Sequence, residues 1–355
     1  MSSTPANRSA LILAGGRGER FWPWSRPERP KQLLPLARGG RTLLAATLER
    51  ALRLVAPERV LILTARDLVE AVRRECPGVS VVGEPVARNT APAVGAAASW
   101  FASRGSGAFV VLPADHLIDD VDAFAGDAER AFAAAECERV LVTFGIPATG
   151  PETNFGYIHR GAKVGERLYR VARFIEKPDR ARAERYVRDG EHFWNSGMFV
   201  WRPEVFLDAL EASRPALAGA LRQLHGSGAL SEPDFERALE PVFPGLEAIS
   251  VDYAVLERAP NTLVLEARFD WDDLGSWGAW ARRQPKDERG NVLFGDALAL
   301  DCRRCIVVGD GGTAAALGLE DMVIVHAQGS TLACRIGETD RVRGVTEALR
   351  ERGRR

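Results

Sequence analysis

The sequence has little excess charge of either sign and contains no long hydrophobic run. Lys and Arg total 47 against 48 for Asp and Glu, so the formal net charge is −1. This balance gives no bulk electrostatic reason to bind nucleic acid or an anionic membrane surface. No apolar stretch approaches the ~20 residues of a membrane-spanning helix, and no apolar signal-peptide core follows Met1–Arg8. We therefore expect a cytoplasmic protein with no membrane and no nucleic-acid partner.

Cysteine is also scarce, with five residues at irregular spacing. An odd number without a regular pattern argues against a disulfide framework. Cys302 and Cys305 form a CxxC pair, but neither a second ligand pair nor a thioredoxin-like context accompanies them. Their apolar, strand-like surroundings favour a structural role, and the sequence assigns them no function.

The first 145 residues alternate short apolar runs with helical patterns. This alternation predicts an α/β fold: a Rossmann-like, mostly parallel or mixed sheet with helices on both faces. Ligands bind such sheets beyond the carboxyl ends of the strands, so the loops that follow the strands are where a site is expected. The predicted strands are 9–14, 59–64, 79–82, 109–112 and 140–144, and the predicted helices are 43–55, 67–75, 90–104 and 122–137.

Past about residue 285 the composition changes to short Val, Leu and Ile runs broken by Gly and Asp. Short strands separated by tight turns predict a small β-domain built as a few solenoid coils. A chain of 355 residues is long enough for one large domain and one small domain. We therefore predict a division into residues 1–285 and 286–355. The expected strands of the second part are 291–300, 305–308, 314–317, 322–326 and 331–334, with a closing helix at 339–350.

A glycine-rich loop follows the first predicted strand, with the sequence Gly15-Gly16-Arg17-Gly18. Glycine lets the backbone approach a phosphate closely, and arginine supplies charge-assisted hydrogen bonds. The segment is not a P-loop, because no Gly-Lys-Ser/Thr follows, and not a dinucleotide motif, because Phe21 occupies the last glycine position. On its own, a strand-to-helix turn that merely needs glycine remains an equal alternative.

Three charged residues outside this loop are further candidates for a phosphate-binding site. Pro30 fixes the backbone just before Lys31, which makes Lys31 a candidate to project into the same loop. Asp115 follows a buried predicted strand, and Asp273 lies in an acidic segment between two tryptophans. Each aspartate alone is more often a turn or a cap. Mg²⁺, however, takes one or two carboxylates together with phosphates and water, and one acid from each half of the chain would satisfy it.

The motifs of this region resemble those of the sugar nucleotidylyltransferases. The resemblance rests on Gly15-Gly16-Arg17-Gly18-x-Arg20-x-x-Pro23 and on Pro30-Lys31-x-x-Leu34-Pro35. Trp22-Pro23-x-Ser25-Arg26 and Lys31-Gln32 are similar to the mannose-1-phosphate guanylyltransferase branch of that family. The resemblance implies that the loop wraps a nucleoside triphosphate whose charge Arg17 and Lys31 neutralise. Its implied nucleotide contacts include Leu13, Ala14, Gly15, Gly16 and Arg17.

Further strings match the family in chain order. Glu84-Pro85-x-x-x-Asn89-Thr90 is similar to its base-recognition loop, although Asn89 or Thr90 also suits a helix cap. A guanine edge offers N–H donors that an oxygen of Glu84 or Asn89 can accept. The resemblance also implies that Asp115 contacts the nucleotide and that Asp115 and Asp273 bind the metal. The implied sugar-phosphate residues are Gly156, Tyr157, Glu176, Lys177, Asn195 and Ser196, with Lys177 as a catalytic cation.

The resemblance therefore implies Mg²⁺-dependent transfer of GMP from GTP to α-D-mannose 1-phosphate, giving GDP-mannose and pyrophosphate. It also implies a nucleotide-diphospho-sugar transferase fold in residues 1–285 and a left-handed β-helix-like domain in 286–355, which suggests a homodimer through that domain. Two alternatives stay open. One is another nucleotide or hexose 1-phosphate, and the other is a non-catalytic GDP-mannose-binding relative, which would be expected to lose Arg17, Lys31 or an aspartate. His116 and Asp252 receive no role.

Overall fold

The computed structural model describes residues 7–16, 18–224 and 228–353, so Arg17 lies outside the described residues. The described chain forms two compact units. The larger unit holds the chain up to Gly15 together with 47–114 and 118–271, and the smaller unit holds 16–46, 115–117 and the chain from Asp272 onward. Among the described residues, no helix has both the length and the apolar character needed to cross a membrane.

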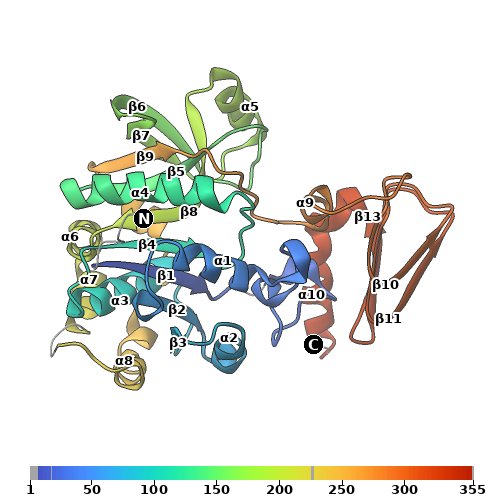
Figure 1. Ribbon diagram of the computed structural model, residues 1–355, viewed down its shortest axis with the longest axis horizontal. Coiled ribbons are helices and arrows are strands. Elements are labelled where there is room, and N and C mark those ends of the chain that lie inside the picture. The colour runs from blue at the N-terminus through green and yellow to red at the C-terminus, as the bar shows by residue number, and fades with distance from the viewer. Residues whose placement is uncertain (1–6, 17, 225–227, 354–355) are drawn as a thin grey trace. The chain divides into compact units, whose positions relative to one another are not determined.

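A nine-stranded mixed sheet forms the centre of the larger unit, in the order β3-β2-β1-β4-β8-β5-β9-β7-β6 (Figure 1). Neighbours among β3, β2, β1 and β4 are parallel, whereas β8 runs antiparallel to both β4 and β5. The predicted α/β fold with a mixed sheet is therefore confirmed. The strands are β1 Arg8–Ala14, β2 Val60–Ala65, β3 Ser80–Glu84, β4 Ala108–Pro113, β5 Leu141–Pro147, β6 Tyr157–Gly165, β7 Leu168–Ile175, β8 His192–Trp201 and β9 Thr262–Glu266.

Helices cover both faces of this sheet (Figure 1). One face packs on α3, α6, α7 and α8 through a large apolar cluster that includes Leu11 and Phe109. On the other face, Phe124 of α4 contacts Phe144 of β5 with ring centroids 6.3 Å apart. The helices are α1 Leu43–Leu52, where the chain passes from the smaller unit to the larger, α2 Val69–Glu75, α3 Thr90–Ser103, α4 Val121–Cys137, α5 Arg180–Asp189, α6 Pro203–Ser213, α7 Pro215–Gln223 and α8 Glu232–Leu239.

The central strands read as continuous apolar runs because both faces are covered. All but one of the residues of β1 are buried. The sequence also marks where helices begin. The Asp120 side chain accepts a hydrogen bond from the Ala123 N–H at the start of α4, and the Asn89 side chain caps α3 by accepting from the Thr90 N–H. These local signals explain why the elements of the first half were predictable.

The smaller unit contains a four-stranded sheet in the order β10-β11-β12-β13. β11 pairs parallel with β10 and β12, and β13 closes the sheet antiparallel to β12. The closing helix starts slightly later than predicted, after a 3-10 segment at Ile336–Arg341. The elements are β10 Val292–Leu300, β11 Ile306–Leu317, β12 Met322–Ala327, β13 Ser330–Arg335, α9 Trp277–Arg282 and α10 Val342–Glu351.

The prediction of two strands at 305–308 and 314–317 was wrong, because β11 is one strand from Ile306 to Leu317. Gly309 does not make a turn but stays in the ladder, paired with Gly295 on one side and His326 on the other. A Cβ atom at Gly309 would lie 2.2 Å from the Asp296 carbonyl oxygen. Glycine is needed there for a close backbone approach at a bulge and not for a turn.

The core of the smaller unit joins the early loop to the C-terminal sheet. Trp24 stacks on Trp277 with ring centroids 5.8 Å apart and meets Phe294 of β10 at 4.9 Å. Its indole Nε1 donates to Asp310 of β11 at 2.8 Å, and Arg29 donates to the same carboxylate. Residues 16–46 are thus packed against β-strands that lie almost 300 positions later in the chain. The division at residue 285 stays a prediction.

Candidate active site

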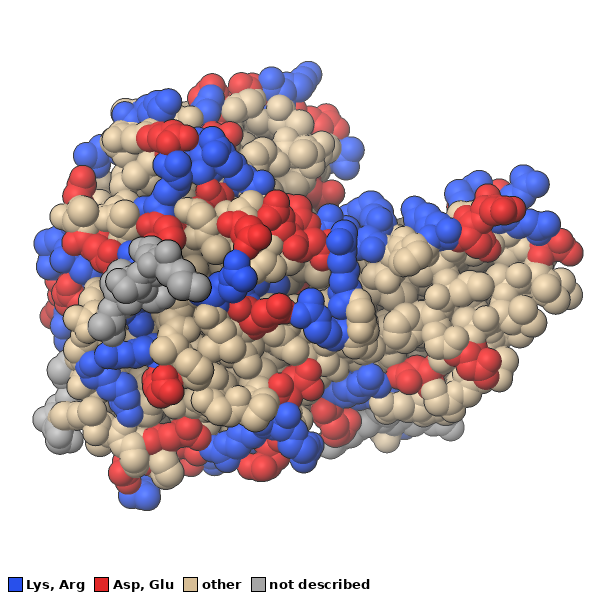
Figure 2. Space-filling view, viewed as in Figure 1, with Lys and Arg blue, Asp and Glu red and all other residues tan. Residues whose placement is uncertain are grey.

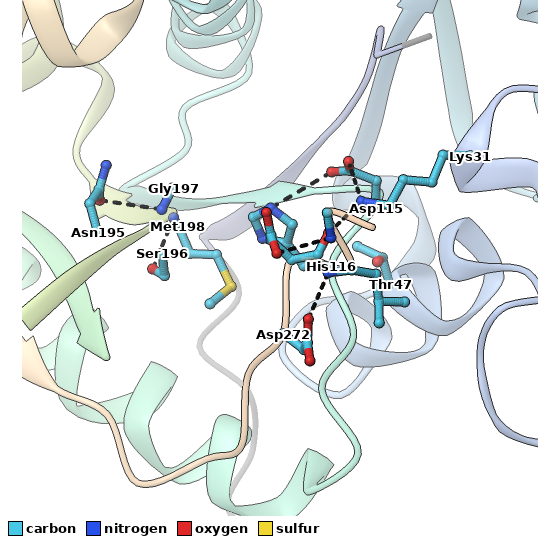
Figure 3. A network of polar contacts seen from close by, with 12 residues as sticks. Lys31, Thr47, Asp115, His116, Asn195, Ser196, Gly197, Met198 and Asp272 are labelled. Carbon is cyan, nitrogen blue, oxygen red and sulfur yellow. Dashed lines mark hydrogen bonds and ion pairs between the residues drawn. The ribbon is translucent and has the colours of Figure 1, made fainter. Parts of the chain in front are cut away.

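Lys31 is the buried centre of the site in the smaller unit. Pro30, in an extended conformation, leads into the 3-10 turn Lys31–Leu33, and the Lys31 side chain is only 8% exposed. Its Nζ donates to the Asp115 Oδ2 at 2.9 Å and also to the main-chain carbonyl of Asp273. Figure 3 shows Lys31 directed at Asp115. The structure therefore brings together the three charged residues that the sequence singled out.

A short antiparallel bridge explains how the two acidic segments meet. The Leu117 N–H donates to the Asp272 carbonyl at 2.9 Å, and the Asp272 N–H donates back at 3.0 Å. The two neighbouring aspartates, Asp272 and Asp273, have different roles. Each carboxylate accepts a main-chain N–H two residues later, Asp272 from Leu274 at 2.8 Å and Asp273 from Gly275 at 3.1 Å, but of the two it is Asp273 that lines the cavity beside Lys31.

The carboxylates of Asp115 and Asp273 differ electrostatically. Burial alone would raise the pKa of Asp115, but the charges of Lys31 and His116 hold that pKa below its usual value. Burial raises the pKa of Asp273, as do the neighbouring charges of Asp272 and Asp115, against the opposing effect of Lys31. The two residues thus line one cavity, where the Lys31 ammonium pairs with the carboxylate of Asp115 and with the main-chain carbonyl of Asp273. Such a pair suits a divalent cation.

Among the described residues, no group of three or more His, Cys, Asp or Glu side chains could hold a metal ion. A cation on Asp115 and Asp273 would therefore need further oxygen ligands from a substrate or from water. This is the usual arrangement for Mg²⁺, which keeps several waters and shares its carboxylates with phosphates.

A cavity of about 390 Å³ surrounds this cluster, which is within the size range of small-ligand sites. Gly18 forms one wall in a left-handed conformation, with φ of 60°. A Cβ atom on Gly18 would lie 2.2 Å from the Lys31 Cβ, so only glycine fits. The cavity is lined by Gly18, Glu19, Arg20, Phe21, Lys31, Asp115, His116, Asp273, Leu274, Gly275 and Arg343.

Sequence reasoning missed Arg343 entirely and left His116 without a role, although both line this cavity. The Nε2 of His116 lies 3.7 Å from the Asp115 Oδ1, so it contributes to the field around that carboxylate. The position of His116 next to Asp115 was the available signal. For Arg343 the sequence offered none, because it lies in a C-terminal segment without a recognisable motif.

The predicted base-recognition residues lie in the larger unit, after β3. The Glu84 Oε1 is buried and has no hydrogen-bond partner among the described residues, and its Oε2 would lie 3.6 Å from a Cβ on Gly15. Burial raises the pKa of Glu84 to about 7. Leu13 and Ala14 end β1, directly before Gly15 and Gly16 in the sequence. An unpartnered buried carboxyl group is expected to seek N–H donors.

Asn89 and Thr90 are engaged in holding the backbone. The Asn89 Oδ1 accepts from the Thr90 N–H at 2.8 Å at the start of α3, with φ of 66°, so the capping role is confirmed. The Thr90 Oγ1 accepts from the Val251 N–H at 2.9 Å. Pro85, directly after Glu84, is half-buried.

A second polar cluster in the larger unit gathers three of the predicted sugar-phosphate residues. The Asn195 Nδ2 donates to the Asp252 Oδ1 at 2.9 Å, and the Asn195 N–H donates to the Gly156 carbonyl at 2.8 Å. A Cβ on Gly156 would lie 2.7 Å from the Glu176 Oε2. Burial raises the pKa of Asp252 to about 6, and the charge of Glu176 adds to the shift. Asp252 thus belongs to this cluster, although the sequence analysis gave it no role.

The other predicted sugar-phosphate residues differ in availability. Lys177 is 63% exposed, has φ of 46°, and places its Nζ 3.2 Å from the Glu176 Oε1. The Tyr157 hydroxyl donates to the Gly150 carbonyl at 3.3 Å. The Ser196 hydroxyl donates to the Phe144 carbonyl at 2.8 Å and is buried in β8. Figure 3 shows Asn195 and Ser196 side by side on this strand. The hydroxyl groups of Ser196 and Tyr157 are thus engaged with main-chain carbonyls, those of Phe144 and Gly150.

Comparison with known proteins gives consistent results along the chain. The profile of the family described as "Nucleotidyl transferase" matches residues 9–290. That of the "MannoseP isomerase/GMP-like beta-helix domain" matches residues 295–349, in agreement with the predicted β-helix-like C-terminal domain.

Individual proteins resemble the chain over almost its whole length. A "Mannose-1-phosphate guanylyltransferase" of Klebsiella pneumoniae is 39% identical over 352 residues, 97% of this chain and 74% of that protein. The "Xanthan biosynthesis protein XanB" of Xanthomonas campestris pv. campestris (strain B100) is 38% identical over 345 residues, 96% of this chain and 72% of that protein. A crystal structure of a "mannose-1-phosphate geranyltransferase" from Thermus thermophilus has a TM-score of 0.88 at 39% identity, covering 97% of this chain and 99% of that one.

Proposed function

The chain belongs to the nucleotidyl transferase family, and from that premise we propose that it transfers GMP from GTP to α-D-mannose 1-phosphate, giving GDP-mannose and pyrophosphate. The names of the similar proteins support the choice of base and sugar. The observation that carries the proposal is Lys31, held between Asp115 and Asp273 in a cavity walled by Gly18. The ammonium group can bind phosphate oxygens, the two acids can bind a metal ion, and the glycine backbone leaves room for a polyphosphate to approach closely.

In the proposed reaction, an oxygen of the sugar phosphate attacks the α-phosphorus of GTP in line. The bond to the β-phosphate oxygen breaks, and pyrophosphate leaves with the electron pair. The nucleophile is already an anion, so no general base and no covalent intermediate are required. Catalysis then consists of positioning and of stabilising charge. Lys31 would offset the charge on the departing pyrophosphate, and Arg17, outside the described residues, is proposed to assist it.

We propose Mg²⁺ as the cofactor, held by Asp115 and Asp273. The fit rests on the chemistry of the donor set, because both aspartates line one cavity beside Lys31 and offer the oxygen ligands that Mg²⁺ prefers. When bound, the ion would offset phosphate charge and allow two anionic substrates to approach each other. Lys31 orients the Asp115 carboxylate through its 2.9 Å hydrogen bond and fixes the Asp273 backbone.

The base and sugar contacts are proposed for the larger unit. Glu84, with a buried carboxyl oxygen that lacks a partner among the described residues, would accept the N–H donors of the guanine edge. The sugar hydroxyls would bind to the cluster of Asn195, Glu176 and Gly156, and Lys177 would pair with the 1-phosphate. The ammonium of Lys177 is available for this because its side chain is largely exposed beside Glu176.

We further propose a homodimer through the C-terminal domain. Leu298 and Leu300 on the edge strand β10 are 47% and 52% exposed, and Leu317 of β11, which pairs with Leu300, is 69% exposed. Figure 2 shows few charged side chains over β10 and β11. An exposed apolar edge of this kind is usually covered. Replacing Leu300 and Leu317 by Lys should convert a dimer to a monomer in light scattering, and an unchanged mass would contradict the proposal.

The test of function is pyrophosphate release from the purified full chain with GTP and mannose 1-phosphate, with and without Mg²⁺. Parallel reactions contain ATP, UTP or dTTP, or glucose 1-phosphate. Mg²⁺-dependent release that is fastest with GTP and mannose 1-phosphate supports the proposal. Release with another pair keeps the chemistry but overturns the base or the sugar. A folded protein that binds GDP-mannose and releases no pyrophosphate from any pair would instead be a regulatory relative.

A further inference from the structure

We infer that Arg343, in the first turn of the C-terminal helix α10, is a further phosphate-binding residue of the Lys31 cavity. Arg343 lines the same cavity as Gly18, Lys31 and Asp115, and all of these residues belong to the smaller unit. The inference rests on the proposed function, because it concerns the pyrophosphate part of the nucleotide. It would make a helix at the end of the chain part of the substrate site.

The negative charge of Glu19, directly after the glycine-rich loop, is unfavourable for binding a polyphosphate. Glu19, between Gly18 and Arg20, also lines the cavity. A carboxylate there would repel a polyphosphate. Two arginines of α10 face it: Arg350 donates to the Glu19 carboxylate, and the Arg343 Nε lies 3.7 Å from it. Helix α10 therefore supplies positive charge that neutralises Glu19, so that the cavity can still bind a polyphosphate.

The two arginines hold Glu19 with different strength. Arg350 makes a direct hydrogen bond, whereas Arg343 is at the limit of an ion pair and is shared with Glu347, 3.2 Å away. The Arg343 side chain is 69% exposed and thus only loosely held. A guanidinium binds a phosphate with two parallel charge-assisted hydrogen bonds, which are stronger than such loose pairs. Arg350 keeps Glu19 neutralised while Arg343 turns to the phosphate.

The position of Arg343 is fixed by the helix that carries it. Val342 and Thr346 are buried, and the Thr346 hydroxyl donates to the Arg343 carbonyl at 2.7 Å. Arg341, two positions earlier, offers a matched control. It is 83% exposed, pairs with Glu338 and is not part of the cavity wall.

The experiment compares the full-length wild-type protein with Arg343→Gln, Arg343→Lys and Arg341→Gln. Initial rates give KM for GTP and for mannose 1-phosphate in the forward direction and for pyrophosphate in the reverse direction. Titration calorimetry of Mg²⁺-pyrophosphate gives an affinity that does not depend on turnover. For Arg343→Gln we expect KM for GTP and pyrophosphate, and the dissociation constant of pyrophosphate, to rise about tenfold, as for loss of one charge-assisted hydrogen bond.

The other values complete the expected pattern. KM for mannose 1-phosphate should stay at the wild-type value in Arg343→Gln. For Arg343→Lys, KM for GTP and for pyrophosphate should lie between the values of the wild type and of Arg343→Gln. Arg341→Gln should match the wild type in every constant. Pyrophosphate binding by Arg343→Gln equal to that of Arg341→Gln overturns the inference and leaves the proposed function intact. An equal rise in KM for both substrates also overturns it. A wild-type protein that releases no pyrophosphate refutes the proposed function, and the calorimetric comparison then still decides whether Arg343 binds phosphate.

Discussion

One ammonium group, on Lys31, donates both to the Asp115 carboxylate and to the main-chain carbonyl of Asp273. The three residues come from widely separated parts of the chain, and Lys31 is almost completely buried. A buried charge of this kind is costly to leave without partners, so the cluster is stable only as a unit. The same arrangement places a cation and two acids in one cavity, as the proposed binding of a polyphosphate requires.

Replacing Lys31 by Gln should lower the rate of pyrophosphate release by about 10²–10³-fold, because a preorganised donor to the leaving group is lost. The change keeps a polar side chain of similar length, so the loss can be attributed to the charge. Steady-state kinetics on folded protein measures the effect. Lys286→Gln, at an exposed position of the same unit, serves as control and should match the wild type. Wild-type activity in Lys31→Gln would remove Lys31 from the mechanism.

The neighbouring aspartates should behave differently. Asp273→Asn removes one of the two proposed metal-binding charges and should lower the rate by about 10²-fold and raise the Mg²⁺ concentration needed for half-maximal rate. Asp272→Asn keeps an oxygen that can accept from the Leu274 N–H and should stay close to wild type. Rates measured across a Mg²⁺ titration separate the two. An equal loss of rate in both variants would mean that the negative charge of the segment matters, and not a specific metal ligand at Asp273.

Gly18→Ala should lower the rate of pyrophosphate release almost as much as the change at Lys31. The new Cβ would lie 2.2 Å from the Lys31 Cβ, and the left-handed backbone of Gly18 disfavours alanine by about 1–2 kcal/mol. Kinetics and thermal unfolding measure the two effects. Gly337→Ala is the matched control in the same unit, because no described atom lies within 4 Å of a Cβ at Gly337. Unimpaired activity in Gly18→Ala would show that the position of Lys31 is not critical.

Asn195→Ala tests the sugar cluster. It removes the 2.9 Å hydrogen bond to Asp252 and a proposed contact to a sugar hydroxyl. KM for mannose 1-phosphate should rise about tenfold, while KM for GTP should stay unchanged. Asn261→Ala is the control, since the Asn261 side chain donates to the Arg139 carbonyl in the larger unit and belongs to no proposed contact. A rise in KM for GTP instead would place Asn195 in the nucleotide part of the site.

Much of the fold was predictable because local signals and tertiary packing agree. Residues 10–14 of β1 are apolar on both faces, and Asn89 and Asp120 mark the starts of α3 and α4. β11 was split in two because Gly309 reads as a turn in sequence, whereas in the structure it allows a close backbone approach. A single glycine cannot distinguish these uses, since both require the absence of a Cβ.

The site was predictable where its residues lie in motifs and not where they depend on packing. Lys31, Asp115 and Asp273 each follow or flank a recognisable string, and the structure brings them together. Arg343 reaches the cavity only because α10 is packed in the smaller unit, and Asp252 reaches Asn195 only through the pairing of distant segments. No local pattern records such long-range contacts.

The binding of GTP should depend on pH through Glu84. Because burial raises the pKa of Glu84 to about 7, its carboxyl group is largely protonated at pH 6 and ionised at pH 8. An ionised carboxylate accepts both N–H donors of a guanine edge, so KM for GTP should fall as the pH rises from 6 to 8. Glu84→Gln should lack this pH dependence and have a high KM for GTP throughout. A pH-independent KM in the wild type would contradict the role of Glu84.

Ionisation of Glu84, which should favour GTP binding, should lower the stability of the folded protein. A carboxyl group whose pKa is raised on folding contributes stability that is fully present below its ordinary pKa and is lost as the pH rises through about 7. At pH 8 the buried charge should therefore destabilise the protein by on the order of 3 kcal/mol. Glu84→Gln should raise Tm at pH 8 but not at pH 4, and Glu58→Gln, at an exposed position in the same unit, should change neither. If Glu84→Gln lowers Tm at pH 8, the carboxylate has a stabilising partner, and its availability to guanine is refuted.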